Sequence, residues 1–186
     1  MAEFLFSTRF TNKGPTNKNV GSLGGVSFTR SNGLYTNNIG RSAFFEPESD
    51  KAGLEIVGSS LSAITNHLSK PRCELGLYLR YKIKKKDLYA SDKYANIPII
   101  SYIDPNTSKA VDLLSIDNKD HFTLTINEAE SFTTKNIDYS FDGNWHCLYI
   151  SKNAGYVNIF IDGILNVSAS CDGTIQQIKM SPRMYI

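Results

Sequence analysis

A chain of 186 residues with a formal net charge of +2 has the size of one globular domain and is too close to neutral to favour nucleic acid as a partner. Hydrophobic residues make up 41% and charged residues 20%, which excludes an intrinsically disordered chain. No run approaches the roughly 20 apolar residues of a membrane helix. The opening MAEFLFSTRF lacks the basic and apolar parts of a signal peptide, so we expect no membrane insertion and synthesis in a cytoplasm.

The N-terminal third has few regular patterns. Residues 7–25 are polar and glycine-rich after a short FLF segment, so we interpret residues 1–25 as a partly extended arm of a single domain that covers 1–186. Residues 52–57 are a candidate strand. Residues 58–70 are the one candidate for a helical turn.

The segment CELGLYLRYKI, residues 73–83, alternates strictly in polarity. Every second residue is apolar, as expected of a strand with one face in the core. The apolar set is Leu75, Leu77, Leu79, Tyr81 and Ile83, and the other face carries Gly76, Tyr78, Arg80, Lys82 and Lys84. Further strands are predicted at 97–103, 111–116 and 121–127, with turn residues between them.

The segment FDGNWHCLYISKNAGYVNIFIDGILNVSAS, residues 141–170, indicates three strands in a meander. They are expected at 144–151, 156–161 and 164–169. Asp162-Gly163 is the type of dipeptide that forms a two-residue hairpin turn. Turns every 8–12 residues are typical of an antiparallel sandwich or jelly roll, so the fold class is all-β.

The same segment resembles the signature of laminin-G-like, concanavalin A-like jelly rolls, which have a W-H pair at the start of a strand and a D-G pair at the end of another. The resemblance implies a two-sheet antiparallel jelly-roll sandwich, and a structural role for Trp145, His146, Asp162 and Gly163, with Trp145 closing one end of the core. Sandwiches of this kind serve as lectins, adhesion modules, glycanases and viral structural parts. The matching residues are Asp142, Gly143, Trp145, His146, Gly155, Ile159, Ile161, Asp162 and Gly163.

No catalytic set is apparent. Glycanases with this fold resemble one another in an E-x-D-x-E strand, which this chain lacks. The acids of 46–50 and the pair Glu128 and Glu130 are interpreted as solvated loop residues. The three histidines, His67, His121 and His146, have no metal-ligand spacing. We therefore expect no enzymatic activity.

The three cysteines, Cys73, Cys147 and Cys171, are an odd number without a C-x-x-C pair. We expect free thiols, with Cys147 buried. Because neighbouring strand residues point to opposite faces, Cys147 and His146 do not form a catalytic dyad.

Calcium is the one cofactor that the sequence leaves open. Some laminin-G-like domains bind it with aspartates of the rim loops, and a hard cation prefers such oxygen ligands. Turn aspartates are also common because they hydrogen-bond to their own backbone. The candidates are Asp104, Asp117, Asp120 and Asp142.

Tyr78, Arg80 and Lys82 are the candidate ligand-binding residues, because they share one face of a predicted strand. An aromatic ring beside cations can stack a sugar and hold acidic substituents. The alternative is a solvated strand end.

Two functional hypotheses follow. The first is a bacteriophage virion structural or surface protein, made in the host cytoplasm, which contacts other virion proteins, copies of itself or a cell-surface glycan. The second is a soluble carbohydrate-binding lectin.

Overall fold

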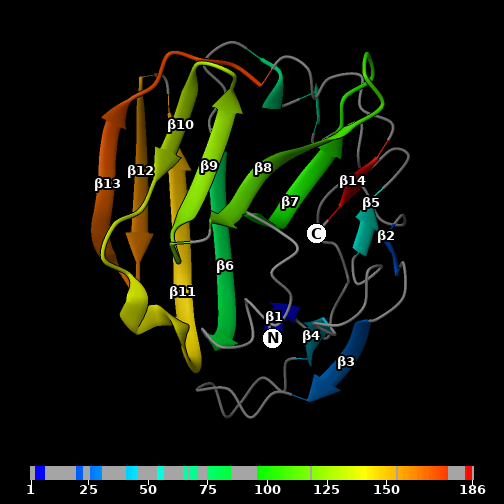
Figure 1. Cartoon of the computed structure of the whole chain (residues 1–186), viewed down its shortest axis with the longest axis vertical. Helices are drawn as coiled ribbons and strands as arrows, with labels where there is room; N and C mark the ends of the chain where they lie inside the picture. Colours follow the sequence, from blue (N-terminus) through cyan, green and yellow to red (C-terminus); the bar gives the residue numbers. More distant parts are fainter. Residues whose placement is uncertain are drawn as a thin grey trace.

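The structure is a computed structural model (Figure 1) in which the N-terminal strands and Tyr185 are described by their backbone alone. The described residues are 3–6, 20–22, 26–30, 41–45, 54–56, 65–66, 68–70, 75–84, 96–117, 119–153, 155–175 and 183–185.

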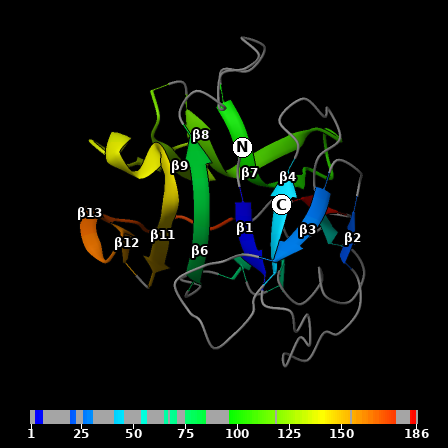
Figure 2. The same cartoon turned by 90° about the horizontal axis from the view of Figure 1, so that it is seen from below.

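Two antiparallel sheets of seven strands each make up the fold. Figure 2 shows the order of the first sheet, from β13 on the left to β3 on the right. The first sheet contains, in spatial order, β13 (Ile164–Ser170), β12 (Tyr156–Ile161), β11 (Asp142–Lys152), β6 (Leu75–Lys84), β1 (Glu3–Phe6), β4 (Arg41–Phe45) and β3 (Val26–Arg30). The second contains β10 (Glu130–Thr133), β9 (Phe122–Asn127), β8 (Ala110–Asp117), β7 (Asn96–Ile103), β14 (Met184–Tyr185), β5 (Leu54–Ile56) and β2 (Val20–Ser22).

The core lies between the inward faces of the two sheets, as the alternating pattern predicts. Tyr81 and Ile83 of β6 are buried, and Leu75, Leu77 and Leu79 pack against the core at the other end of the strand. The second sheet contributes buried residues of β8 and alternate residues of β9, among them Leu114, Ile116, Phe122, Leu124 and Ile126. The predicted fold class, an all-β sandwich of two antiparallel sheets, is confirmed.

The sequence-based strands match the observed ones within two residues, but several elements escaped prediction. These are β10, β14, the strands before residue 50 and a 3-10 turn, η1 (Asp138–Phe141). A helical turn is present within 58–70, where the Ser69 N–H donates to the Thr65 carbonyl at 3.0 Å. No helix among the described residues is long and apolar enough to cross a membrane.

Residues of the expected N-terminal arm take part in both sheets. β1 lies between β4 and β6 in the first sheet, and β2 pairs with β5 in the second. Residues 7–19 and 23–25 lie outside the described part of the chain.

The hairpin between β12 and β13 has the expected two-residue turn. Asp162 and Gly163 both have positive φ angles, 51° and 81°, and Ile161 pairs directly with Ile164 across the turn. Such angles define the tight turn that follows the right-handed twist of the strands.

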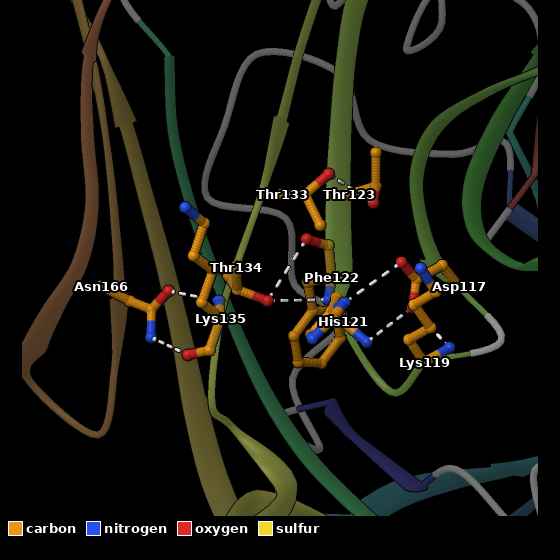
Figure 3. A network of polar contacts seen from close by, with 9 residues as sticks. All are labelled: Asp117, Lys119, His121, Phe122, Thr123, Thr133, Thr134, Lys135 and Asn166. Carbon is orange, nitrogen blue, oxygen red and sulfur yellow. Dashed lines mark hydrogen bonds and ion pairs between the residues drawn. The ribbon is translucent and has the colours of Figure 1, made fainter.

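Side chains close the sandwich where β10 and β13 lie near each other (Figure 3). The amide of Asn166 on β13 donates to the Lys135 carbonyl at 2.8 Å and accepts from the Lys135 N–H at 2.9 Å. The Thr134 hydroxyl in turn accepts from the Phe122 N–H at 2.9 Å. The carboxamide of Asn166 thus replaces a strand partner at this edge, linking the first sheet to the segment that follows β10.

Candidate functional site

A row of large side chains crosses the outer face of the first sheet. The register pairs Tyr78 with Tyr149, Tyr149 with Phe160 and Phe160 with Leu165, so one residue from each of β6, β11, β12 and β13 stands in line. Tyr78 is 59% exposed, Tyr149 41% and Leu165 52%. The rings of Tyr149 and Phe160 lie 5.8 Å apart. We call Tyr78, Tyr149, Phe160 and Leu165 the aromatic row, after the three rings among them. The three steps from strand to strand span about 14 Å.

Arg80 and Trp145 adjoin the aromatic row at the β6 and β11 side. The Arg80 Cζ lies over the Trp145 ring, 5.4 Å from its centroid. Trp145 pairs with Lys82, whereas its neighbour His146 pairs with the inward-facing Tyr81. The expectation that Trp145 closes the core is therefore wrong: Trp145 alternates regularly with Cys147 and Tyr149 along β11, so its ring lies on the outer face.

Cys147 also differs from its expected position. It is half-buried on the outer face, and its Sγ lies 3.0 Å from the Tyr78 Oη. Of the two cysteines in the described part of the chain, Cys171 is the buried one, at 1% exposed, and Cys73 lies outside that part. Both described cysteines are free, as the sequence indicated. His146 and Cys147 do lie on opposite faces of β11, because they pair with Tyr81 and Arg80 respectively.

Small polar residues line the other side of the aromatic row. Ser151 pairs with both Gly76 and Asn158, and Asn158 pairs with Ser168. A Cβ atom added to Gly76 would lie 3.9 Å from the Tyr149 hydroxyl, so glycine leaves the edge of this ring uncovered. Hydroxyl and amide groups are thereby placed within reach of anything that stacks on the row.

On the inner side of β11, His146 is held between two carboxylates. Its Nδ1 lies 2.7 Å from the Asp162 Oδ2 and its Nε2 lies 3.1 Å from the Asp142 Oδ1. The second Asp162 oxygen accepts the Cys147 N–H at 2.8 Å. We call Asp142, His146 and Asp162 the histidine clamp. The clamp joins the start of β11 to the β12–β13 turn. Its hydrogen bonds were not predicted from the sequence.

The clamp favours the charged forms of its members. Burial disfavours a charged imidazole, but hydrogen bonds to Asp162 and Asp142 outweigh it and raise the pKa of His146 above its ordinary value. Hydrogen bonds from the Asn144 N–H, from His146 and from the Asn144 amide lower the pKa of Asp142 to about 2. Because both ring nitrogens of His146 contact carboxylates, neither is directed at a substrate. The clamp is therefore suited to hold strands together.

The four calcium candidates lie in three different turns, with Asp117 and Asp120 in the same one, and mostly serve those turns. The Asp104 carboxylate accepts the Asn106 N–H at 2.8 Å and the Thr107 hydroxyl at 2.9 Å, and the first of these bonds is the main reason that its pKa is lowered. Asp142 belongs to the histidine clamp. In the described part of the chain, no group of three or more His, Cys, Asp or Glu side chains is placed to hold a metal ion.

Asp117 (Figure 3) and Asp120 shape the β8–β9 turn, where the Asp120 N–H donates to the Asp117 carbonyl at 3.2 Å. The Asp117 carboxylate accepts the Lys119 N–H at 2.8 Å and the His121 N–H at 2.9 Å, and it lies 3.3 Å from the His121 Nδ1. Partial burial opposes ionisation of Asp117, but these hydrogen bonds lower its pKa overall. Asp120 is buried with a φ of 63°.

Glu128 and Glu130 lie at the β9–β10 turn. Glu128 is exposed, and Glu130 accepts from the Asn127 amide and from the Asp172 N–H, both at 3.2 Å. Glu130 thus fastens the chain after β13 to the β9–β10 hairpin. Residues 46–50 and His67 lie outside the described part of the chain.

Several solved structures are similar to this chain, among them the three that follow. A carbohydrate esterase from the Shiga toxin-encoding bacteriophage phi24B has a TM-score of 0.53 and 12% identity, covering 98% of this chain and 87% of that one. Domain 4 of AbnA, an extracellular arabinanase from Geobacillus stearothermophilus, has a TM-score of 0.48 and 13% identity, covering 98% and 71%. Domains LG4-5 of the mouse laminin alpha1 chain have a TM-score of 0.38 and 17% identity, covering 64% of this chain and 29% of that one.

No protein-family model and no curated protein matches the sequence. The chain spans less than a third of the laminin fragment. At 12% identity, the similarity to the phage chain concerns the fold alone. Together with the two seven-stranded antiparallel sheets, it supports the fold class predicted from the sequence, a two-sheet antiparallel β-sandwich.

Proposed function

We propose that this protein is a non-enzymatic binding module that holds a carbohydrate against the aromatic row of its first sheet. The observation that carries the proposal is the alignment of Tyr78, Tyr149 and Phe160 in one register row with two of the rings well exposed. Contiguous exposed apolar groups mark binding surfaces in soluble proteins. Aromatic rings set on strands offer a rigid, flat support for a sugar ring at little entropic cost.

The polar neighbours of the row favour a sugar over a protein partner. Ser151, Asn158 and Ser168 flank the rings with hydroxyl and amide groups, which can bond to sugar hydroxyls. The centre of a stable protein interface, in contrast, is usually more apolar. The occupied nitrogens of His146 and the absent E-x-D-x-E strand support a role without catalysis.

A glycan-binding screen of the purified chain, with calcium and then with chelator, tests this proposal. Removal of one ring, by Tyr149→Ala or Tyr78→Ala, is expected to weaken binding by about fivefold or more, since a stacked ring contributes about 1 kcal/mol beyond its buried area. Tyr139→Ala is the matched control, because Tyr139 is 49% exposed in η1 and lies outside the row.

Absence of saturable binding to any glycan would overturn the proposal, as would equal binding by Tyr149→Ala and Tyr139→Ala. Binding that disappears only with chelator would instead assign the site to the turn aspartates.

We further propose a bacteriophage particle as the place where this module acts, as a surface or structural part. The similarity to the phage esterase chain supports this location, since it extends over nearly the full length of both chains. A purely structural part would self-associate or bind virion proteins without sugar affinity. Sedimentation velocity at several concentrations, run beside the glycan screen, separates the two roles.

A further inference from the structure

A second row of side chains crosses the outer face of the first sheet beside the aromatic row. Its members lie two residues from Tyr78, Tyr149 and Phe160 on their own strands, roughly 7 Å away, and the row continues to the next outward residue of β13. The row is exposed at both ends and half-buried in the middle. We call its four residues the polar row: Gly76, Ser151, Asn158 and Ser168.

Tyr156 lies on the opposite side of the polar row from the aromatic row. It precedes Asn158 by two residues and Phe160 by four on the same face of β12, and its side chain is 58% exposed. Asn158 therefore lies between two aromatic residues whose Cα atoms are about 13 Å apart. A ligand on the polar row would contact aromatic side chains on both sides.

The polar row offers hydrogen-bonding groups and no charge. Within the described part of the chain, the side chains of Ser151, Asn158 and Ser168 form no hydrogen bond. Hydroxyl and carboxamide groups both donate and accept, as the hydroxyls of a sugar do. Tyr156 and the aromatic row are also uncharged at neutral pH. A neutral sugar, with apolar ring faces and hydroxyls at its rim, complements this pattern.

The direction of the two rows sets the shape of the ligand. Both rows run from β6 across β11 and β12 to β13, and these four strands lie side by side at one end of the sheet (Figure 2). Adjacent strands are about 4.8 Å apart, close to the length of one sugar residue in an extended β-1,4-linked chain. An extended chain would place one residue at each strand, about four in all. A chain that curls, such as an α-1,4-linked glucan, would leave the rows sooner.

We infer that the ligand is a neutral, extended polysaccharide that lies across the strands along the polar row, between the aromatic row and Tyr156. This inference rests on the proposed function. It adds to that function the class of the ligand, the direction in which the ligand lies, and Tyr156 as a further binding residue.

Isothermal titration calorimetry with oligosaccharides of increasing length tests the inference. Cello-, xylo- and manno-oligosaccharides are the extended neutral probes, malto-oligosaccharides are the curled ones, and oligogalacturonates are the acidic ones. The proteins are the unmodified chain, Tyr156→Ala, Tyr156→Phe, Gly76→Val and the control Tyr139→Ala. Gly76 lacks a positive φ angle, and a Cβ there would have the Tyr149 hydroxyl as its nearest contact, at 3.9 Å. Valine should therefore fill this end of the polar row without backbone strain.

We expect affinity for at least one extended series to rise about fivefold for each aromatic ring that the added sugars reach, and to level off near about four residues. Tyr156→Ala should weaken binding of the tetrasaccharide about fivefold, Tyr156→Phe should keep most of the affinity, and Tyr139→Ala should change nothing. Gly76→Val should move the plateau to a chain that is shorter by one residue.

Affinity independent of chain length, equal affinity for the malto-oligosaccharides, or tighter binding of oligogalacturonates would overturn the inference. Unchanged binding by Tyr156→Ala, with loss in Tyr149→Ala, would overturn it as well and keep the proposed function. If no extended series bound while another glycan did, the inference alone would fail. No binding to any glycan would overturn both proposals.

Discussion

Replacement of Asp162 by alanine is expected to be among the most damaging single changes in the first sheet. The substitution removes both bonds of one carboxylate, the 2.7 Å contact with the His146 Nδ1 and the 2.8 Å bond from the Cys147 N–H. It also places alanine at a φ of 51°, a left-handed conformation that Asp and Asn tolerate better.

The expected loss follows from these three contributions. A hydrogen bond between uncharged groups contributes about 1 kcal/mol and one to a charged group about 1.5–3 kcal/mol. For each of the two Asp162 bonds we take the smaller figure, about 1 kcal/mol, because the Asp162 side chain is 33% exposed and solvent weakens its charge. Left-handed backbone adds about 1 kcal/mol for alanine. Asp162→Ala should therefore lower the free energy of unfolding by about 3 kcal/mol.

Asp162→Asn separates these contributions. Asparagine tolerates the positive φ and keeps one acceptor for the Cys147 N–H, so the loss should be about half as large, roughly 1.5 kcal/mol. Urea denaturation near pH 6, followed by tryptophan fluorescence and by circular dichroism, measures both values. Equal losses for the two variants, or a loss below about 1 kcal/mol for Asp162→Ala, would refute the role assigned to the clamp.

The two remaining stability predictions concern pH and the sandwich edge. Since the folded pKa of His146 is raised, its stabilisation is complete below its ordinary pKa near 6.5 and is lost as pH rises through the folded value, so the unfolding free energy should fall there. The His146→Gln variant should lack this fall of the unfolding free energy with pH. If the variant kept the fall, His146 would be excluded as its cause. The lowered pKa of Asp142, about 2, acts oppositely: its stabilisation is present above pH 4 and is lost as pH falls toward 2. Asn166→Ala removes two hydrogen bonds to the Lys135 backbone and should lower the unfolding free energy by about 1–2 kcal/mol. Asn166→Ser keeps a polar side chain at this position. An equal loss for both variants would show that the carboxamide, rather than polarity, is needed.

The strands with a one-sided pattern could be predicted from sequence because burial imposes a period of two. Tyr81 and Ile83 on β6 and Val157, Ile159 and Ile161 on β12 are buried as the alternation indicates. The Asp162-Gly163 turn was also predictable, because few dipeptides adopt two positive φ angles in succession. Short strands such as β10 and β14 have too few residues to show a period, so they become apparent only from their pairing.

The candidate site was predictable only in part, because it depends on which strands are neighbours. Alternation put Tyr78 and Arg80 on the outer face of β6, and the structure agrees. Tyr149 and Phe160 joined the site only through the register of β11 with β6 and β12, which no single strand reveals. Trp145 was misplaced because large apolar rings usually enter a core, although its alternation with the buried Leu148 and Ile150 already places it on the outer face.

The histidine clamp and the aromatic row are two sides of the same strand, and this couples the structural motif to the proposed binding surface. Within β11, His146, Leu148 and Ile150 face inward while Trp145, Cys147 and Tyr149 face outward. A shift of the β11 register by one residue would turn the inward set outward and the outward set inward. The bulge between Asp142 and Trp145 fixes which residues of β11 face inward. The histidine clamp holds both ends of that bulge, because Asp142 contacts His146. His146 and Asp162, from the W-H and D-G pairs, thus bond β11 to the β12–β13 turn, and the register of β11 with β6 places Tyr149 in line with Tyr78.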